Sequence, residues 1–92
     1  MNTETAVEAE LVAQWIEPDP HKGDPAEARL KASGVSVWAV IGQLELDEWD
    51  VASVAEYYEV PKAAVEAAVA YSHRHEEAIK VRLLRHHAFF AV

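Results

Sequence analysis

The 92-residue sequence contains no cysteine, only three glycines and no long apolar run. The lack of cysteine excludes a disulfide framework and a cysteine-ligated zinc site. No apolar stretch approaches the roughly 20 residues that a membrane-spanning helix needs. The first ten residues are acidic and carry no apolar segment, so we expect neither a signal peptide nor a transit peptide. These absences predict a cytoplasmic protein with no membrane partner.

The sequence also lacks the common catalytic signatures. It has no glycine-rich phosphate loop, no Gly-x-Ser-x-Gly elbow and no His-Glu-x-x-His motif. His73 and Glu77 are the one pair spaced to share an ion on a helix face, but without further ligands we expect a solvated His–Glu contact. We therefore expect no enzyme, no cofactor and no metal. Four acidic residues also lie close together in sequence: Glu45, Asp47, Glu48 and Asp50. They could bind a cation, but we expect a solvated region at a helix cap.

Basic residues are few, since eight Lys and Arg stand against 16 Asp and Glu, for a net charge of −8. A nucleic-acid-binding domain usually presents a basic face, so this balance counts against the simplest DNA-binding interpretation. The charge is uneven, however. Residues 1–30 hold seven of the acids, whereas residues 73–87 carry four Lys or Arg and four histidines against two glutamates. The asymmetry suits operator DNA and an acidic protein partner alike, and leaves both open.

The N-terminal third combines a helical pattern with turn signals. Thr5 and Glu8 have capping-box spacing, and apolar residues then recur every four positions, which predicts a helix over 5–14. The prolines and glycine that follow predict a loop over 18–28. Residues 29–35 are expected to form a short strand with a turn or bulge at Ser33-Gly34.

Helical periodicity dominates the rest of the chain. Ser36 is a candidate N-cap, and Asp50 a second. Pro61 suits the first position of a third helix. The apolar pattern is interrupted near residue 73, so we expect either one long helix or two joined there, ending at about 86. The inner face of the first of these helices has i, i+3, i+4, i+7 spacing: Val37, Val40, Ile41 and Leu44.

Three residues at intervals of five match a helix-turn-helix. Ala55 supplies the small residue at the helix crossing, Val60 the apolar plug of the turn, and Val65 the inner residue of the second helix. Glu59 stands where glycine is usual, so either the turn differs or Glu59 is strained. A plain helical hairpin remains the alternative.

The predicted second helix would present a surface of small side chains and nearly zero net charge to DNA, without Arg, Asn or Gln to read bases. That surface comprises Lys62, Ala63, Glu66, Ala67 and Ala70. Cations around it would have to supply the affinity, and the candidate DNA-binding residues are Arg29, Lys31, Lys62 and Arg74. The tryptophans Trp15, Trp38 and Trp49 fit a stacking platform for single strands or, as we expect, a core or dimer interface.

The C-terminal segment is the best candidate for binding a protein. It combines arginine with aliphatic and aromatic residues, which are enriched at interface hot spots. The candidate partner-binding residues are Arg82, Leu83, Arg85, Phe89 and Phe90. The alternative is a helix that docks on its own core or on a dimer mate.

Residues 30–80 resemble domain-of-unknown-function family 433. The segments LKASGVSVWAVIGQL and DVASVAEYYEVPKAAVEAAVAYSHRHEEAI carry the likeness, with Gly23-Asp24-Pro25 upstream. The chain departs from the family at the turn, where Ala32-Ser33-Gly34 replaces a Gly-Thr-Arg pattern. The resemblance implies a winged helix-turn-helix-like fold and a VapB-type antitoxin that neutralises a PIN-like ribonuclease toxin and represses its own operon. An antitoxin guanidinium would then pair with the acidic metal ligands of the toxin.

Together these patterns predict one mainly α domain over 1–92, with a short strand or hairpin and a long C-terminal helix. Its parts are an N-terminal helix and loop (1–29), a helix-turn-helix core (30–72) and a C-terminal helix and tail (73–92). We expect a homodimer, because a chain this short buries only a modest core. The predicted function is an antitoxin-like DNA-binding regulator, and the alternative is a dimeric protein–protein adaptor that binds no DNA.

Overall fold

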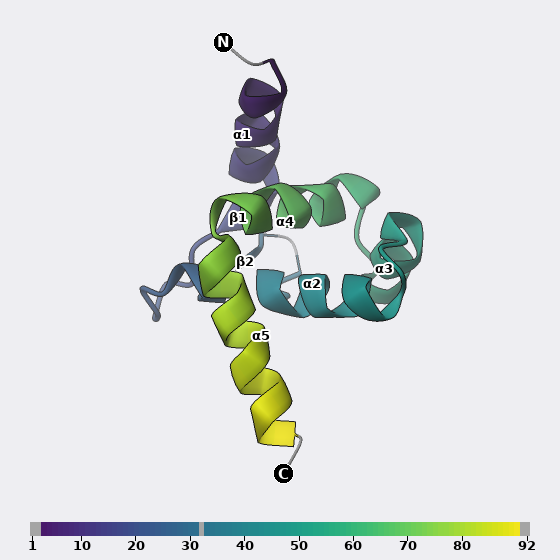
Figure 1. Cartoon of the computed structure of the whole chain (residues 1–92). Coiled ribbons are helices and arrows are strands. Elements are labelled where there is room, and N and C mark those ends of the chain that lie inside the picture. Colours follow the sequence, from purple (N-terminus) through teal and green to yellow (C-terminus); the bar gives the residue numbers. More distant parts are fainter. Residues whose placement is uncertain (1–2, 32, 91–92) are drawn as a thin grey trace.

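The computed structural model describes residues 3–31 and 33–90, and for residues 3–5 and 88–90 it describes the backbone alone. The mainly α fold with one short hairpin is confirmed (Figure 1). The helices are α1 (Thr3–Trp15), α2 (Val37–Leu46), α3 (Val51–Tyr58), α4 (Lys62–Arg74) and α5 (Glu76–Phe90). The remaining elements are strands β1 (Ile16–Glu17) and β2 (Arg29–Leu30) and the 3-10 helix η1 (Pro25–Glu27).

The first helix starts earlier than its predicted cap. α1 begins at Thr3, so Thr5 lies inside the helix and the capping box predicted there is wrong. The residues around Thr5 are mainly Glu and Ala, which are strong helix formers and favour extension upstream. Val7 on this helix is exposed, whereas Leu11 and Trp15 pack against the core. Only the second half of α1 therefore faces the body of the protein.

A minimal antiparallel hairpin follows α1. Ile16 of β1 lies opposite Leu30 of β2, and both side chains are buried. The strand predicted over 29–35 has only two paired residues, because the chain reverses directly afterwards. Gly34 has a φ of +74°, a conformation that favours glycine, and its N–H donates to the carbonyl of Leu30 at 2.9 Å. The amide of Leu30 in turn donates to Val35 at 2.8 Å, which closes the reversal.

The apolar face predicted for α2 is confirmed. All four of its residues are buried, and the helix starts after Ser36 as expected. Ser36 holds the N-cap position without a side-chain hydrogen bond, so its extended backbone rather than its hydroxyl begins the helix. The buried residues are Val37, Val40, Ile41 and Leu44.

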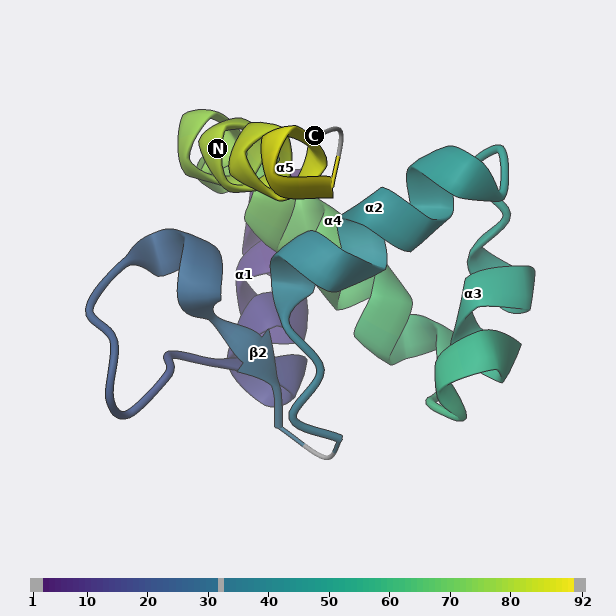
Figure 2. The ribbon, with the colours of Figure 1, turned by 90° about the horizontal axis from the view of Figure 1, so that it is seen from below.

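α4 is the central helix of the molecule, with α1, α2 and α3 packed against it (Figure 2). Ala64, Ala67 and Ala68 on this helix are buried. Such small side chains let neighbouring helices approach closely, because the interaxial distance depends on side-chain size at the contact. α4 thus forms the axis around which the other helices are arranged.

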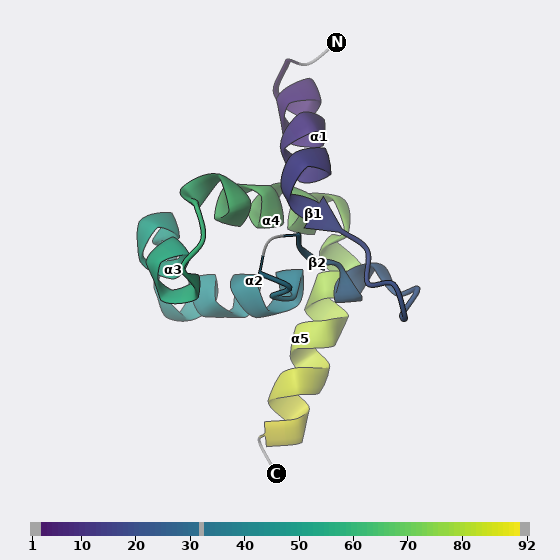
Figure 3. The same cartoon turned by 180° about the vertical axis from the view of Figure 1, so that it is seen from behind.

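Two helices, rather than one, follow residue 62. The break lies at His75, whose backbone leaves the helical region with φ −123° and ψ 39°. The interruption predicted near residue 73 is therefore a true helix boundary, and α5 runs to Phe90 instead of ending at about 86. α5 turns away from α4 and extends beyond the body on the side opposite α1, as Figure 3 shows from behind. No helix within 3–31 and 33–90 is long and apolar enough to cross a membrane.

Candidate functional site

Residues 59–61 connect α3 to α4 at the turn that the sequence predicted. Ala55 and Val65 are buried where the two helices meet, and the N–H of Val60 donates to the carbonyl of Ala55 at 2.9 Å. Glu59 adopts the left-handed conformation, with φ 56° and ψ 47°. The sequence left open whether the turn differs from the usual one or Glu59 is strained. Glu59 is strained, since this conformation costs a non-glycine residue about 1–2 kcal/mol. Pro61 is the N-cap of α4, whereas the sequence predicted it at the first position of the helix itself.

Two of the five residues predicted to face outward from α4 are buried. Ala67 and Ala70 are buried, with exposed fractions of 0% and 6%, so the prediction that they would face DNA is wrong. The physical reason is long-range packing, because α1 crosses α4 and packs against it (Figures 1 and 3). The helix leaves a narrow exposed strip that includes Lys62 and Glu66. These two opposite charges leave the strip close to neutral.

The structure does not gather the four candidate DNA-binding cations on one face. Arg29 donates from Nε to Glu17 at 3.0 Å, and Lys31 donates from Nζ to the carbonyl of Ala13 at 2.7 Å. Lys62 and Arg74 are exposed at opposite ends of α4, about 18 Å apart at 1.5 Å per residue.

The candidate partner-binding residues fall on different sides of α5. Leu83 belongs to the core, with only 7% of its surface exposed, and Arg82 also points toward the body. Arg85 is exposed. Phe89 and Phe90 lie in the helix, but their side chains are outside the described part of the chain.

Arg82 links α5 to distant parts of the fold. Its Nε donates to Oε1 of Glu27 in η1 at 3.0 Å, and its guanidinium carbon lies 4.1 Å from the centre of the Trp38 ring. Both side chains of the ion pair are mostly buried, with exposed fractions of 25% and 16%. His86 packs against the same indole at a ring distance of 5.0 Å. These contacts fix the direction in which α5 leaves the body.

Two residues on the outer face of α5 were absent from the predicted set. Val81 and Leu84 are 43% and 67% exposed, although both are large and apolar. Their spacing of i, i+3 puts them on one helix face. The sequence does carry this signal, because Ile79 and Leu83 define the inner face and Val81 and Leu84 are out of phase with both.

We call residues 78–90 of α5 the arm. The arm contains Lys80, Arg82 and Arg85 and no acid, and its net charge is +3. The rest of the chain carries all 16 acids with the other five cations, and its net charge is −11. A cationic arm with exposed apolar residues thus projects from an acidic body (Figures 1 and 3).

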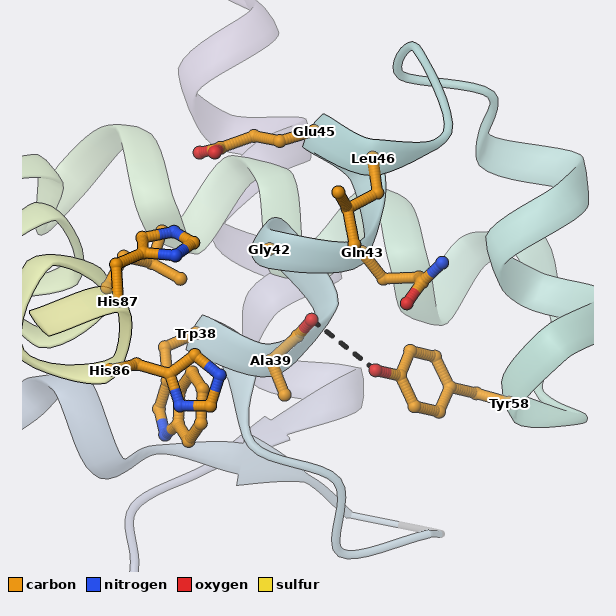
Figure 4. A pocket seen from close by; sticks show the side chains of 10 residues that line it. Trp38, Ala39, Gly42, Gln43, Glu45, Leu46, Tyr58, His86 and His87 are labelled. Carbon is orange, nitrogen blue, oxygen red and sulfur yellow. Dashed lines mark hydrogen bonds between the residues drawn. The ribbon is translucent and has the colours of Figure 1, made fainter. Parts of the chain in front are cut away.

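An open groove lies between α2, α3 and the arm. Its volume is about 460 Å³. α2 provides a floor of small residues, Ala39 and Gly42, and Leu46 stands at its rim with 78% of its surface exposed. His86 lines the side formed by the arm, and Tyr58 of α3 closes the far side (Figure 4).

Tyr58 is held in the groove by both burial and a hydrogen bond. Its hydroxyl donates to the carbonyl of Ala39 at 3.4 Å, a long bond between α3 and α2. Burial raises the pKa of Tyr58, and the neighbouring Tyr57 raises it further. The phenol therefore stays neutral well above physiological pH, and the only charged side chain that α2 contributes to the groove is Glu45.

The acidic residues between 45 and 50 and the histidines form no recognisable metal centre. Asp50 caps α3 by accepting from the amide of Ser53 at 3.1 Å, and Asp47 accepts from the hydroxyl of Ser53 at 3.2 Å. His73 and Glu77 lie on separate helices, so the single helix face that would pair them does not exist. In the part of the chain that the structure describes, no group of three or more potential ligands is placed to hold a metal ion.

Comparison with known proteins gives no relative for this chain: no family model, curated protein or solved structure matches it.

Proposed function

We propose that the protein is an antitoxin-like regulator that acts by binding an acidic partner protein through its arm. The observation that carries this proposal is the composition of the exposed arm surface. Val81 and Leu84 lie open beside the cation Arg85, on a segment without any acid. Arginine beside apolar residues is typical of interface centres, where charge gives orientation and apolar burial gives affinity.

The partner is expected to present carboxylates next to an apolar depression. The planar guanidinium of Arg85 can donate two parallel hydrogen bonds to one carboxylate, an arrangement that a lysine cannot reproduce. A metal-binding cluster of acids, as in PIN-like ribonucleases, supplies such carboxylates. Occupation of that cluster by Arg85 would displace the metal and inhibit the nuclease.

The test is capture of the partner by the full-length tagged protein from its own cells after nuclease treatment, with identification by mass spectrometry. Leu84→Asp and Arg85→Glu should each abolish capture, because one puts a charge in the apolar contact and the other reverses the cation. Val7→Asp is the matched control, since Val7 is similarly exposed on α1, far from the arm. Equal capture by all three variants would exclude the arm as the binding surface.

DNA binding is the second candidate, and the helix-turn-helix connection favours it. The N-terminal end of α4 is exposed at Lys62, and in helix-turn-helix proteins this end of the second helix contacts bases. The covered surface of α4 and the charge of −8 make this role secondary to protein binding. The experiment is titration of duplex DNA from the protein's own promoter at about 50 and 200 mM salt. A DNA-reading role requires binding that weakens steeply between the two and is reduced by Lys62→Glu.

A further inference from the structure

Among the side chains that the structure describes, none fills the groove beside the arm, whose rim is apolar at Leu46. Leu46 at the rim is the most exposed large apolar residue of the described chain, at 78%. Leaving such a side chain exposed beside an apolar depression keeps apolar surface in contact with water, which is unfavourable. An occupant with its own apolar surface would remove that surface from water. Ala39 has a short side chain, so an occupant can approach the backbone of α2 closely there. Gly42 already packs against the arm of its own chain, since Leu83 Cδ2 lies 3.2 Å from the position that a β-carbon would take.

The α2 and α3 sides of the groove lie on an acidic segment, whereas its arm side carries His86 and His87. Residues 33–61, which include α2, α3 and their connecting loop, contain six Asp or Glu and no Lys, Arg or His. Glu45 lies in the groove itself, and Glu56 and Glu59 lie on and just after α3. An occupant that matches this surface must carry positive charge together with its apolar residues.

The arm of the same chain has both properties. It presents Val81, Leu84 and Arg85 on its exposed side, and it has no acid that would repel residues 33–61. Lys80 and Arg82 already pair with Glu76 and Glu27 of their own chain, so Arg85 is the cation offered to the groove. The arm cannot turn back into its own groove, because Leu83 and His86 already form one side of it. The matching arm must come from another molecule.

We propose that two copies of the chain form a symmetric homodimer in which the arm of each copy occupies the groove of the other. Because the arm borders the groove, a two-fold axis between the arms brings both contacts together and makes the interface self-complementary. The contact then occurs twice. A stable interface of about 1,200 Å² in total therefore needs only about 600 Å² from each arm and groove.

This inference stands apart from the proposed function, although the two share the arm. In the dimer, Val81 and Leu84 are covered by the second copy, and a stronger acidic partner has to displace it. Leu46 and the groove belong to the dimer alone. A substitution at Leu46 thus separates the two proposals, since it should break the dimer and leave capture of the partner intact.

The first experiment is sedimentation equilibrium of the full chain over a range of concentrations. The expected mass is twice the 10.2 kDa of one chain at high concentration. Leu46→Asp and Leu84→Asp should each raise the dimer dissociation constant by at least about tenfold, which corresponds to 1.4 kcal/mol. Val7→Asp should leave it unchanged. Since all three positions are exposed, circular dichroism should show each variant to be folded.

Mixing the two disruptive variants tests the exchange of arms directly. In a dimer of either variant alone, both contacts contain a substitution. In the mixed dimer, the intact arm of the Leu46→Asp copy meets the intact groove of the Leu84→Asp copy, so one contact is restored. The mixture should therefore associate more strongly than either variant alone.

Four results would overturn the proposal. A chain that stays monomeric at all concentrations has no such dimer. A dimer that resists both Leu46→Asp and Leu84→Asp uses another surface. A mixture that associates no better than its components shows that arm and groove do not meet, even if each substitution weakens the dimer. A monomer whose groove binds a different cationic helix would assign the groove to a separate protein and equally refute exchange.

Discussion

Replacement of Arg82 by methionine should destabilise the fold far more than the same replacement of Lys80. Arg82 bonds to Glu27 at 3.0 Å, and the pair is mostly buried, whereas Lys80 bonds to Glu76 at the same distance with both side chains about 70% exposed. Methionine keeps most of the apolar stem of either residue. The comparison therefore isolates the charged contacts and not the loss of side-chain volume.

The expected magnitudes follow from burial. A hydrogen bond to a charged group contributes about 1.5–3 kcal/mol, and the contact of Arg82 with Trp38 adds about 0.5–1 kcal/mol. Arg82→Met also leaves Glu27 without this partner at 16% exposure. We expect a loss of about 2–3 kcal/mol in the free energy of unfolding. Lys80→Met should cost at most about 0.5 kcal/mol, as is usual for an exposed pair four residues apart on a helix.

Urea unfolding followed by circular dichroism measures both changes, with all proteins at one concentration because association would shift the midpoint. For a domain of this size, each 1 kcal/mol lowers Tm by about 4–8 °C. The double variant Glu27→Gln, Arg82→Met should lose less than the sum of the two single losses, since the residues form one contact. Equal losses for Arg82→Met and Lys80→Met would refute the claim that this pair fastens α5 to η1.

Three further predictions concern the turn and two tyrosines. Glu59→Gly should stabilise the protein by about 1 kcal/mol in urea unfolding, because glycine tolerates φ 56° without strain, whereas Glu56→Gly, in the exposed helix just before it, should destabilise by a similar amount. Tyr71→Phe should cost about 0.5–1.5 kcal/mol, because the Tyr71 hydroxyl donates to the carbonyl of Pro25 at 2.6 Å. Burial raises the pKa of both Tyr71 and Tyr58, so their contribution to stability is complete below pH 10 and is lost as pH rises through the raised values. The double Phe variant should lose this alkaline decline, and an unchanged decline would contradict the assignment.

The sequence predicts well those elements that local physics determines. The apolar face of α2 follows from 3.6-residue periodicity alone, and the cap of α3 follows from Asp50. The strain at Glu59 was also foreseeable, because the turn between α3 and α4 favours a residue without a β-carbon. In each case the determining residues lie within one or two helical turns of the feature that they produce.

Features produced by distant contacts were not predictable in this way. Glu27 and Arg82 are 55 residues apart in sequence, and no local pattern pairs them. The burial of Ala67 and Ala70 was likewise not predictable, because an alanine fits a buried contact and an exposed helix face equally well. The outer face of the arm depends on the orientation of α5. Val81 and Leu84 are exposed because the helix turns Ile79 and Leu83 toward the core, and composition alone does not give that orientation.

The alanines of α4 connect packing with function. A helix that reads DNA needs donors and acceptors on its outer face, and Ala67 and Ala70 offer neither. The same small side chains let α1 lie against α4 and bury that face. Packing and composition therefore act in the same direction, and they support a helix-turn-helix pair that serves as the core of the domain. Outside α4, exposed apolar side chains lie on the arm and on residues 33–61. Arg85 is the exposed cation of the arm, because Lys80 and Arg82 pair with Glu76 and Glu27, whereas residues 33–61 hold six acids and no cation. Because these two regions are opposite in charge, any binding through them should weaken as salt screens the exposed charges, and the apolar contact at Leu46 and Leu84 should persist.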